Sequence, residues 1–258
     1  MRLVVKVGTS TLAHPTGRLN IRHVEALCKV LSDLKNSGIE VILVSSGAIG
    51  MGVGKLNIKG RPEDMATKQA AAAVGQCELM YTYDKLFSEY NHTVAQILLT
   101  GYDVHNRESY GNFCNTMFRL IDLGVLPVIN ENDTVSTDEI SIGDNDTLSA
   151  IVATSIKADL LVLLSDIDGL YTADPHKCSE AQLIDTVTDI TDDIVSLAGG
   201  AVTGQGTGGM VTKINAARMC MQSGCDMIIA NGENPEILYD IADGKKIGTR
   251  FIATGVND

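Results

Sequence analysis

The sequence contains no apolar run long enough to cross a bilayer, which needs roughly 18 to 20 residues. Its apolar stretches, such as 125–129 and 159–164, are far shorter. The N-terminus passes from Met1 through Lys6 directly into glycine and polar residues, so it lacks the long apolar region of a signal peptide. We therefore expect a protein of the cytoplasm that has no membrane partner.

Disulfide and metal-binding patterns are also missing. Six cysteines are spread widely over 258 residues, no C-x-x-C motif occurs, and a chain of this size needs no disulfide to fold. The five histidines are distant from one another in the sequence and form no H-E-x-x-H motif. We expect reduced thiols and no zinc site built by the protein alone.

Positive charge is scarce, because the formal net charge at pH 7 is -12. Nucleic-acid binding depends on Lys and Arg side chains that neutralise phosphates, so we expect no nucleic-acid partner. Basic residues near an anionic ligand have to be few and local. Lysines beside glycine-rich loops are therefore the cations of interest.

Linkers and internal repeats are absent too. The five prolines are scattered, no Ser/Gly/Pro tract is long, and no segment repeats at a fixed period. With 45% hydrophobic residues the chain can bury a full core. We expect a single domain over residues 1–258.

Strand and helix patterns alternate along the chain. A β-rich run at 2–7 precedes a helical pattern at 21–34 that Asn20 caps, and a strand at 39–44 leads into a glycine-rich turn at 46–54. A helical stretch at 63–90 follows, with an interruption near Gly75. Further strands are expected at 93–99, 125–129, 160–164, 227–230 and 251–253, and further helices at 107–123 and 210–223. This alternation predicts an α/β fold, a three-layer sandwich with a mainly parallel central sheet flanked by helices.

Glycine, serine and acidic or amide residues follow the predicted strands, at 6–10, 45–48, 130–133, 143–146 and 165–169. Strand ends need turn residues of these types, which is the simplest interpretation of any one loop. Together they bring polar groups to the sheet edge where α/β proteins bind ligands, and they suit a nucleotide and a polar small molecule. The glycine-rich segment 206–213 opens a helix and places Lys213 one turn inside, which favours phosphate binding.

Several nucleotide-binding fingerprints are absent. The glycines at 47–54 do not match G-x-G-x-x-G, and neither glycine-rich loop matches G-x-x-x-x-G-K-[ST]. No H-R-D catalytic loop occurs. Nicotinamide or flavin enzymes, P-loop proteins and protein kinases are therefore disfavoured.

Six ordered motifs resemble the amino acid kinase superfamily, and within it the glutamate 5-kinases, over nearly the whole chain. They are VVKVGTSTL from Val4, SSGAIGMG from Ser45, VINENDTV from Val128, IGDNDTLSA from Ile142, LLSDIDGLYTADP from Leu163 and GTGGMVTK from Gly206. The resemblance implies an amino acid kinase-like fold. It also implies ATP-dependent phosphorylation of the side-chain carboxylate of L-glutamate to L-glutamyl 5-phosphate, the first step of proline biosynthesis.

The resemblance also implies roles for individual residues. Lys6 and Lys213 would contact ATP phosphates, and Asp146 would organise the two lysines, which makes these three the expected catalytic residues. The remaining residues of the expected nucleotide site are Gly8, Ser165, Asp166, Thr207, Gly208, Gly209, Met210, Val211 and Thr212. The residues expected to hold glutamate are Ser46, Asn130, Asp133 and Asn145. Ser165 stands where the family has threonine, which keeps the hydroxyl.

Chemistry supports the same residues. The glutamate carboxyl group, with a pKa of about 4.3, is already ionised at neutral pH and needs no general base to attack the γ-phosphorus. Two lysines and Mg²⁺ would neutralise the phosphate charge, with Mg²⁺ held mainly by phosphate oxygens and water.

Other interpretations remain open. The chain could be another superfamily kinase acting on acetylglutamate, aspartate, carbamate or a nucleoside monophosphate. It could instead be a non-catalytic sensor of nucleotide or amino acid, although a sensor would be expected to have lost one of Lys6, Asp146 and Lys213. The resemblance further suggests a homo-oligomer, a dimer or tetramer, with proline as a feedback inhibitor. It also suggests that the C-terminal RNA-modification-type domain of many bacterial relatives is absent.

Overall fold

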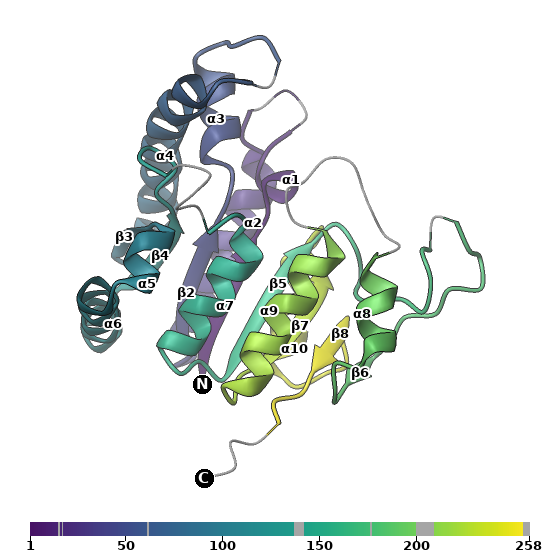
Figure 1. Cartoon of the computed structure of the whole chain (residues 1–258). Helices are drawn as coiled ribbons and strands as arrows, with labels where there is room; N and C mark the ends of the chain where they lie inside the picture. The colour runs from purple at the N-terminus through teal and green to yellow at the C-terminus, as the bar shows by residue number, and fades with distance from the viewer. Residues whose placement is uncertain are drawn as a thin grey trace. The chain divides into compact units, whose positions relative to one another are not determined.

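The computed structural model describes residues 1–14, 16, 18–60, 62–136, 142–175, 177–199 and 209–254 (Figure 1). The backbone divides into two compact units. The C-terminal unit consists of Met1–Lys6 with Gly143–Asp258, and the N-terminal unit is Val7–Ile142. The expected single domain over 1–258 stays a prediction.

Five strands build the sheet of the C-terminal unit, in the order β1-β5-β7-β8-β6. They are β1 (Arg2–Val7), β5 (Leu160–Ser165), β6 (Thr186–Val187), β7 (Asp226–Asn231) and β8 (Thr249–Phe251). β5 and β7 run parallel, so both strands end at the same edge, where Ser165 pairs with Asn231. β8 is antiparallel to β7 and parallel to β6.

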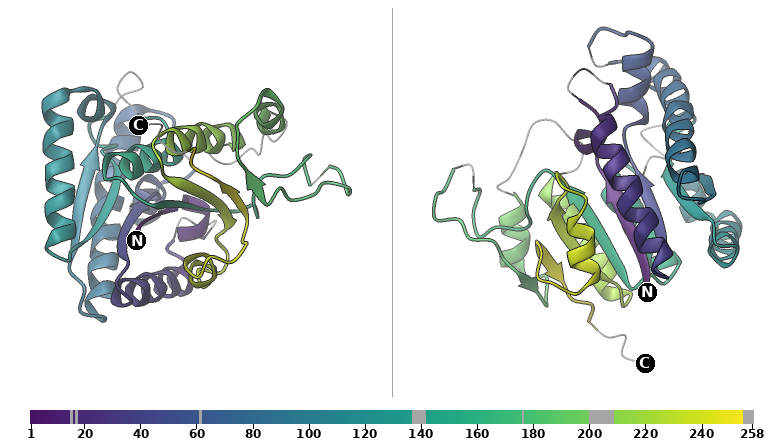
Figure 2. Two further views of the ribbon diagram at one scale, coloured as in Figure 1. Left: turned by 90° about the horizontal axis from the view of Figure 1, so that it is seen from below. Right: turned by 180° about the vertical axis from the view of Figure 1, so that it is seen from behind.

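Helices cover both faces of this sheet. α7 (Asn145–Ser155) and α9 (Met210–Gln222) lie side by side on one face, and α10 (Ile237–Ala242) lies on the opposite face (Figure 2). α8 (Asp192–Gly199) packs against α9. The helix predicted at 210–223 is confirmed as α9, and Ile214, Ala217 and Met221 are among its buried residues.

The N-terminal unit has three parallel strands, β2 (Glu40–Ser45), β3 (Val94–Leu99) and β4 (Leu126–Glu131), with β4 in the middle. α2 (Ile21–Asn36) packs on β2, α4 (Met65–Ser88) on β3 and α6 (Arg107–Asp122) on β4. As predicted, the Asn20 side chain caps α2 by accepting a hydrogen bond from the His23 backbone N–H. Both units thus combine mainly parallel strands with flanking helices, which confirms the predicted α/β fold.

Two expectations about glycine were wrong. The segment predicted as a glycine-rich turn at 46–54 is largely a helix, α3 (Ala48–Lys55), and Gly75 does not interrupt α4. A Cβ atom on Gly52 would lie 1.8 Å from the Ala71 carbonyl oxygen, and one on Gly75 would lie 1.7 Å from the Ala48 carbonyl oxygen. These glycines therefore let the backbones of α3 and α4 touch, which local sequence patterns do not reveal.

The other differences concern short elements and strand ends. The short helices α1 (Thr9–Leu12), α5 (Gly101–His105) and α10, the helices α7 and α8, and strand β6 were not predicted. β4 continues through Asn130 to Glu131, and β8 ends at Phe251 rather than at 253. Within the described ranges, no helix combines the length and apolar character needed to cross a membrane.

Candidate active site

A buried carboxylate lies at the start of α7 in the C-terminal unit. The Asp144 side chain begins the helix by accepting a hydrogen bond from the Thr147 backbone N–H at 2.8 Å. Two residues later, Asp146 is only 1% exposed. A carboxylate in the first helical turn is favoured by the helix dipole, but burial this deep also requires cationic partners.

Two lysines from separate elements supply that charge. Lys6 Nζ, from β1, lies 2.7 Å from Asp146 Oδ1, and Lys213 Nζ, from the first turns of α9, lies 3.0 Å from Oδ2. Both lysines are largely buried, with exposed fractions of 9% and 6%. The structure therefore brings together the three residues expected to be catalytic, although they are far apart in the sequence.

The electrostatics of this cluster favour an ionised carboxylate with excess positive charge around it. Burial alone would raise the pKa of Asp146, but the ammonium groups of Lys6 and Lys213 outweigh burial and lower it to about 2. Two cations and one anion leave a net charge of about +1 in a protein whose total is -12. Each ammonium group has three N–H donors, so donors remain for a second anion such as a phosphate.

The expected nucleotide-binding residues of α9 frame the same cluster. Gly209 is the N-cap of α9, and the Thr212 hydroxyl lies 2.9 Å from Asp146 Oδ2 and 2.7 Å from the Gly209 carbonyl oxygen. Met210 is buried and Val211 is exposed. The N-terminus of a helix with free backbone N–H groups suits an anion. Thr207 and Gly208 lie outside the described residues, and Gly8 is the N-cap of α1 in the N-terminal unit.

Polar residues also gather where β5 and β7 end. Ser165, the last residue of β5, donates a hydrogen bond to Asp166 at 3.1 Å, and Asp166 is exposed. Asp168 accepts hydrogen bonds at 2.8 Å from both Asn231 Nδ2 and the Tyr171 hydroxyl, and these two bonds lower its pKa. The sequence motifs assign no role to Asp168, Tyr171 or Asn231. Asn231 directly follows the strand predicted at 227–230, so its place after a strand is the signal that could have found it.

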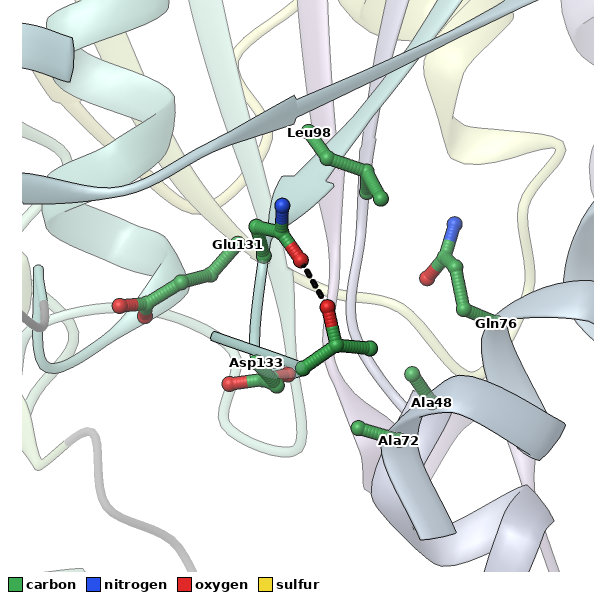
Figure 3. A pocket seen from close by; sticks show the side chains of 8 residues that line it. Ala48, Ala72, Gln76, Leu98, Glu131 and Asp133 are labelled. Carbon is green, nitrogen blue, oxygen red and sulfur yellow. Dashed lines mark hydrogen bonds between the residues drawn. The ribbon is translucent and has the colours of Figure 1, made fainter. Parts of the chain in front are cut away.

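The residues expected to hold glutamate do not all lie in one unit. Ser46, Asn130 and Asp133 belong to the N-terminal unit, whereas Asn145 is the first residue of α7 in the C-terminal unit. In the N-terminal unit a small pocket lies where β4 ends (Figure 3). Its lining consists of Ala48, Ala72, Gln76, Leu98, Glu131, Asn132, Asp133 and Thr134.

Asn130 is buried and makes a hydrogen bond to Gln76, which lines this pocket. Its Nδ2 donates to Gln76 Oε1 at 2.9 Å, and its Oδ1 accepts from the Glu131 backbone N–H at 2.9 Å. Gln76 lines the pocket, but it lies within an Ala-rich helix and no sequence motif marked it. Ser46 directly precedes Gly47, the N-cap of α3, whose φ of 99° is in the left-handed region that favours glycine.

Asp133 differs from Asp146 in that no cationic side chain lines its pocket among the described residues. Burial, and to a lesser extent the charge of Glu131, raise the pKa of Asp133 from its ordinary 3.8 to about 6. In the part of the chain that the structure describes, the other lining residues are uncharged apart from Glu131. A cationic ligand group would relieve this unbalanced charge.

Besides the Lys6–Asp146–Lys213 cluster and the pocket around Asp133, the chain matches a known protein family over most of its length. The model of the amino acid kinase family matches residues 1–231 of the chain. The chain belongs to the amino acid kinase family. The matched range includes Lys6, Asp146 and Lys213, and it extends through all of the N-terminal unit.

Similar curated proteins narrow the family further. The chain is 53% identical over 256 residues to "Glutamate 5-kinase" of Clostridium perfringens (strain 13 / Type A), covering 98% of this chain and 95% of that protein. It is 52% identical over 252 residues to "Glutamate 5-kinase" of Caldanaerobacter subterraneus subsp. tengcongensis, covering 98% of this chain and 68% of that longer protein. The resemblance to glutamate 5-kinases inferred from the six motifs is confirmed.

Solved structures of this amino acid kinase fold agree with the architecture. Carbamate kinase from Giardia lamblia bound to AMP-PNP matches with a TM-score of 0.71 at 16% identity, covering 98% of each chain. UMP kinase from Ureaplasma parvum matches with a TM-score of 0.66 at 14% identity, covering 97% of this chain and 98% of that one. At these identities the matches establish the fold alone.

Proposed function

We propose that this amino acid kinase is an ATP-dependent carboxylate phosphotransferase. It transfers the γ-phosphoryl group of ATP to the side-chain carboxylate of L-glutamate, gives L-glutamyl 5-phosphate, and thereby starts proline biosynthesis. The observation that carries the proposal is the buried cluster of Lys6, Asp146 and Lys213 at the start of α7 and α9. Similarity above 50% identity to glutamate 5-kinases supports glutamate as the acceptor.

The cluster suits a transfer whose main obstacle is repulsion between anions. A carboxylate has to approach a polyphosphate chain, and the transition state spreads charge over the γ-phosphoryl oxygens. Lys6 and Lys213 donate to those oxygens from a nearly dry site, where a fixed charge acts more strongly than in water. Asp146 holds both ammonium groups in place and keeps them from repelling each other. No histidine is needed, because the attacking carboxylate is already ionised.

The nucleotide and the amino acid contact different residues in this proposal. Ser165, Asp166 and the 207–213 segment hold ATP together with Gly8 and the two lysines. Ser46, Asn130, Asp133 and Asn145 hold glutamate, and Asn130 acts through Gln76 and the end of β4. Asp133 faces the ammonium group of glutamate, which relieves the unfavourable burial of its own charge.

Mg²⁺ supplies further charge neutralisation on the phosphate oxygens when it is bound. In this proposal phosphate oxygens and water supply most of the Mg²⁺ ligands, because the ion keeps much of its hydration shell. Among the described residues, no group of three or more His, Cys, Asp or Glu side chains is placed to hold a metal ion. The cytoplasmic location, the homo-oligomeric state and feedback inhibition by proline stay predictions.

The decisive experiment incubates the purified protein with ATP, Mg²⁺, L-glutamate and hydroxylamine. An acyl phosphate on the side chain yields the γ-hydroxamate of glutamate, which is identified by mass spectrometry. Parallel reactions contain acetylglutamate, aspartate, carbamate or UMP, and a reaction without acceptor measures hydrolysis of ATP. Preference for another acceptor would assign a different member of the family, and binding of nucleotide without any transfer would identify a sensor.

A further inference from the structure

Glu131 is a buried acid that has no role in the expected nucleotide or glutamate site. It is the last residue of β4 and is only 7% exposed. Its Oε1 atom accepts two hydrogen bonds, from the Ser136 hydroxyl at 3.0 Å and from the Ile142 backbone N–H at 2.8 Å. A single carboxylate oxygen therefore ties the strand end to two points farther along the chain.

These bonds close a loop that contains Asp133. Ser136 and Ile142 both bond back to the Glu131 side chain. Asp133 lies between Glu131 and Ser136, within the segment that the first of these bonds closes. Figure 3 shows the side chains of Glu131 and Asp133 on the same side of the pocket, away from Gln76. Two carboxylates thus share one side of a pocket whose other described lining residues, from α3, α4, β3 and the end of β4, are uncharged.

The charges of the two acids are coupled. Burial is the first cause and the Glu131 carboxylate the second cause of the raised pKa of Asp133, which is about 6. The two carboxylates repel each other in this poorly hydrated site. A cation between or beside them is therefore attracted by both negative charges. The ammonium group of an amino acid is such a cation, whereas an acylated amine is neutral.

We propose that Glu131 is a positioning residue for the amino-acid substrate: one of its oxygens closes the loop that carries Asp133, and its negative charge makes that loop selective for a free ammonium group. This inference rests on the proposed function and deepens it. It predicts two separable effects, one from the hydrogen bonds and one from the charge.

Matched variants separate the two effects. Glu131→Gln keeps a carbonyl oxygen that can accept both hydrogen bonds but removes the charge. Ser136→Ala removes one of the hydrogen bonds and keeps the charge. Thermal unfolding shows whether each variant folds, and kcat and KM are measured for glutamate and acetylglutamate from pH 5 to pH 8.5.

The expected results differ in kind. In Glu131→Gln, the acid limb of kcat/KM for glutamate moves to lower pH by about 0.5 to 1 unit, and the preference for glutamate over acetylglutamate falls by about 3- to 10-fold. In Ser136→Ala, KM for glutamate rises by a few fold at every pH, and the position of the limb is unchanged. Both variants keep kcat within a few fold, because neither touches the phosphate cluster.

A wild-type pH limb and wild-type selectivity in folded Glu131→Gln would overturn the inference. An equal shift of the acid limb of kcat/KM in Glu131→Gln and Ser136→Ala would also overturn the inference, because the hydrogen bonds of Glu131, without its charge, would then explain the shift. If Glu131→Gln does not fold, the pKa of Asp133 is measured in the unmodified protein by NMR of its carboxyl carbon. A pKa near the ordinary value would overturn the coupling. A pKa near 6 that falls when glutamate binds would support it. Failure of the proposed function gives a different result, namely no hydroxamate from wild-type protein.

Discussion

At the scale of single residues, the surroundings of two aspartates, the buried Asp146 and the half-buried Asp133, shift their pKa values in opposite directions. Asp146 lies between two ammonium groups, so its pKa falls to about 2 despite burial. Among the described residues that line the pocket of Asp133, Glu131 is the only other charged one, and burial together with that charge raises the pKa of Asp133 to about 6. The first aspartate organises fixed cations, and the second one needs a cation from the ligand.

Replacing Lys213 by methionine tests the phosphate cluster. Lys213→Met should lower kcat by on the order of a hundredfold or more and change KM for glutamate little, because a phosphate cation matters most when charge shifts in the transition state. Lys246→Met is the matched control, since Lys246 is exposed and makes no ion pair among the described residues. Steady-state kinetics and thermal unfolding of both variants check this. Near-normal kcat in folded Lys213→Met would remove Lys213 from the mechanism.

Replacing Asp133 by asparagine tests recognition of the ammonium group. Asp133→Asn keeps the shape but removes the charge, which should weaken glutamate binding by roughly 2 to 4 kcal/mol and leave ATP affinity almost unchanged. The preference for glutamate over acetylglutamate should narrow. KM values of both acceptors in wild type and variant give the ratio, and an unchanged ratio would mean that Asp133 does not contact the ammonium group.

The pH dependence of activity follows from the same residue. Because Asp133 is ionised only above about pH 6, kcat/KM for glutamate should fall as pH drops through that value, whereas kcat at saturating glutamate should hold to about pH 5.5. The limb in kcat/KM should vanish in Asp133→Asn. If kcat/KM of Asp133→Asn still fell near pH 6, an essential base such as a histidine would be indicated. A fall of kcat near the same pH in folded protein would indicate the same.

At the scale of secondary structure elements, glycines join α3 to α4 and so place the residues around the pocket. α3 supplies Ala48 and α4 supplies Ala72 and Gln76 to the lining. Gly52 and Gly75 lie where the backbone of the partner helix leaves no room for a Cβ atom. The helix pair therefore depends on two glycines that a local interpretation takes for turn or breaking residues.

Alanine substitutions distinguish contact glycines from an ordinary one. Gly52→Ala and Gly75→Ala should each destabilise the protein by about 1 to 3 kcal/mol or more, because the helices have to separate. Gly50→Ala in the same helix should be neutral or stabilising by up to about 1 kcal/mol, since its Cβ would lie at an ordinary 3.5 Å from Thr9. Urea unfolding measures all three. Equal free energies of unfolding for Gly50→Ala and Gly52→Ala would contradict the close helix contact.

At the scale of the whole molecule, the two aspartates contribute to stability with opposite signs. The folded-state pKa of Asp146 is lowered, so its contribution is present above the ordinary value of 3.8 and is lost as pH falls through about 2. The folded-state pKa of Asp133 is raised, so its ionisation costs stability above about pH 6, and this cost disappears as pH falls below 3.8.

A mutation can remove the loss of stability that ionised Asp133 causes above about pH 6. Asp133→Asn should be more stable than wild type at pH 8 by roughly 1 to 2 kcal/mol, a figure that allows for partial solvent screening, and the difference should nearly vanish at pH 4. Urea unfolding at both pH values tests this. A variant that is less stable than wild type at pH 8 would show that the Asp133 carboxylate is balanced by a cation in the folded protein.

The sequence by itself determined the alternating α/β fold and the start of α9 at Met210, because periodicity is a local signal. The resemblance of its ordered motifs to the amino acid kinases identified Lys6, Asp146 and Lys213 as partners. It also placed Asp133 near the end of β4. Only the tertiary structure decided that the 46–54 segment is a helix, since the reason for its glycines is a backbone more than 15 residues away. The roles of Gln76 and Glu131 likewise emerged only from the fold, because hydrogen bonds across helix, strand and loop leave no mark in local sequence.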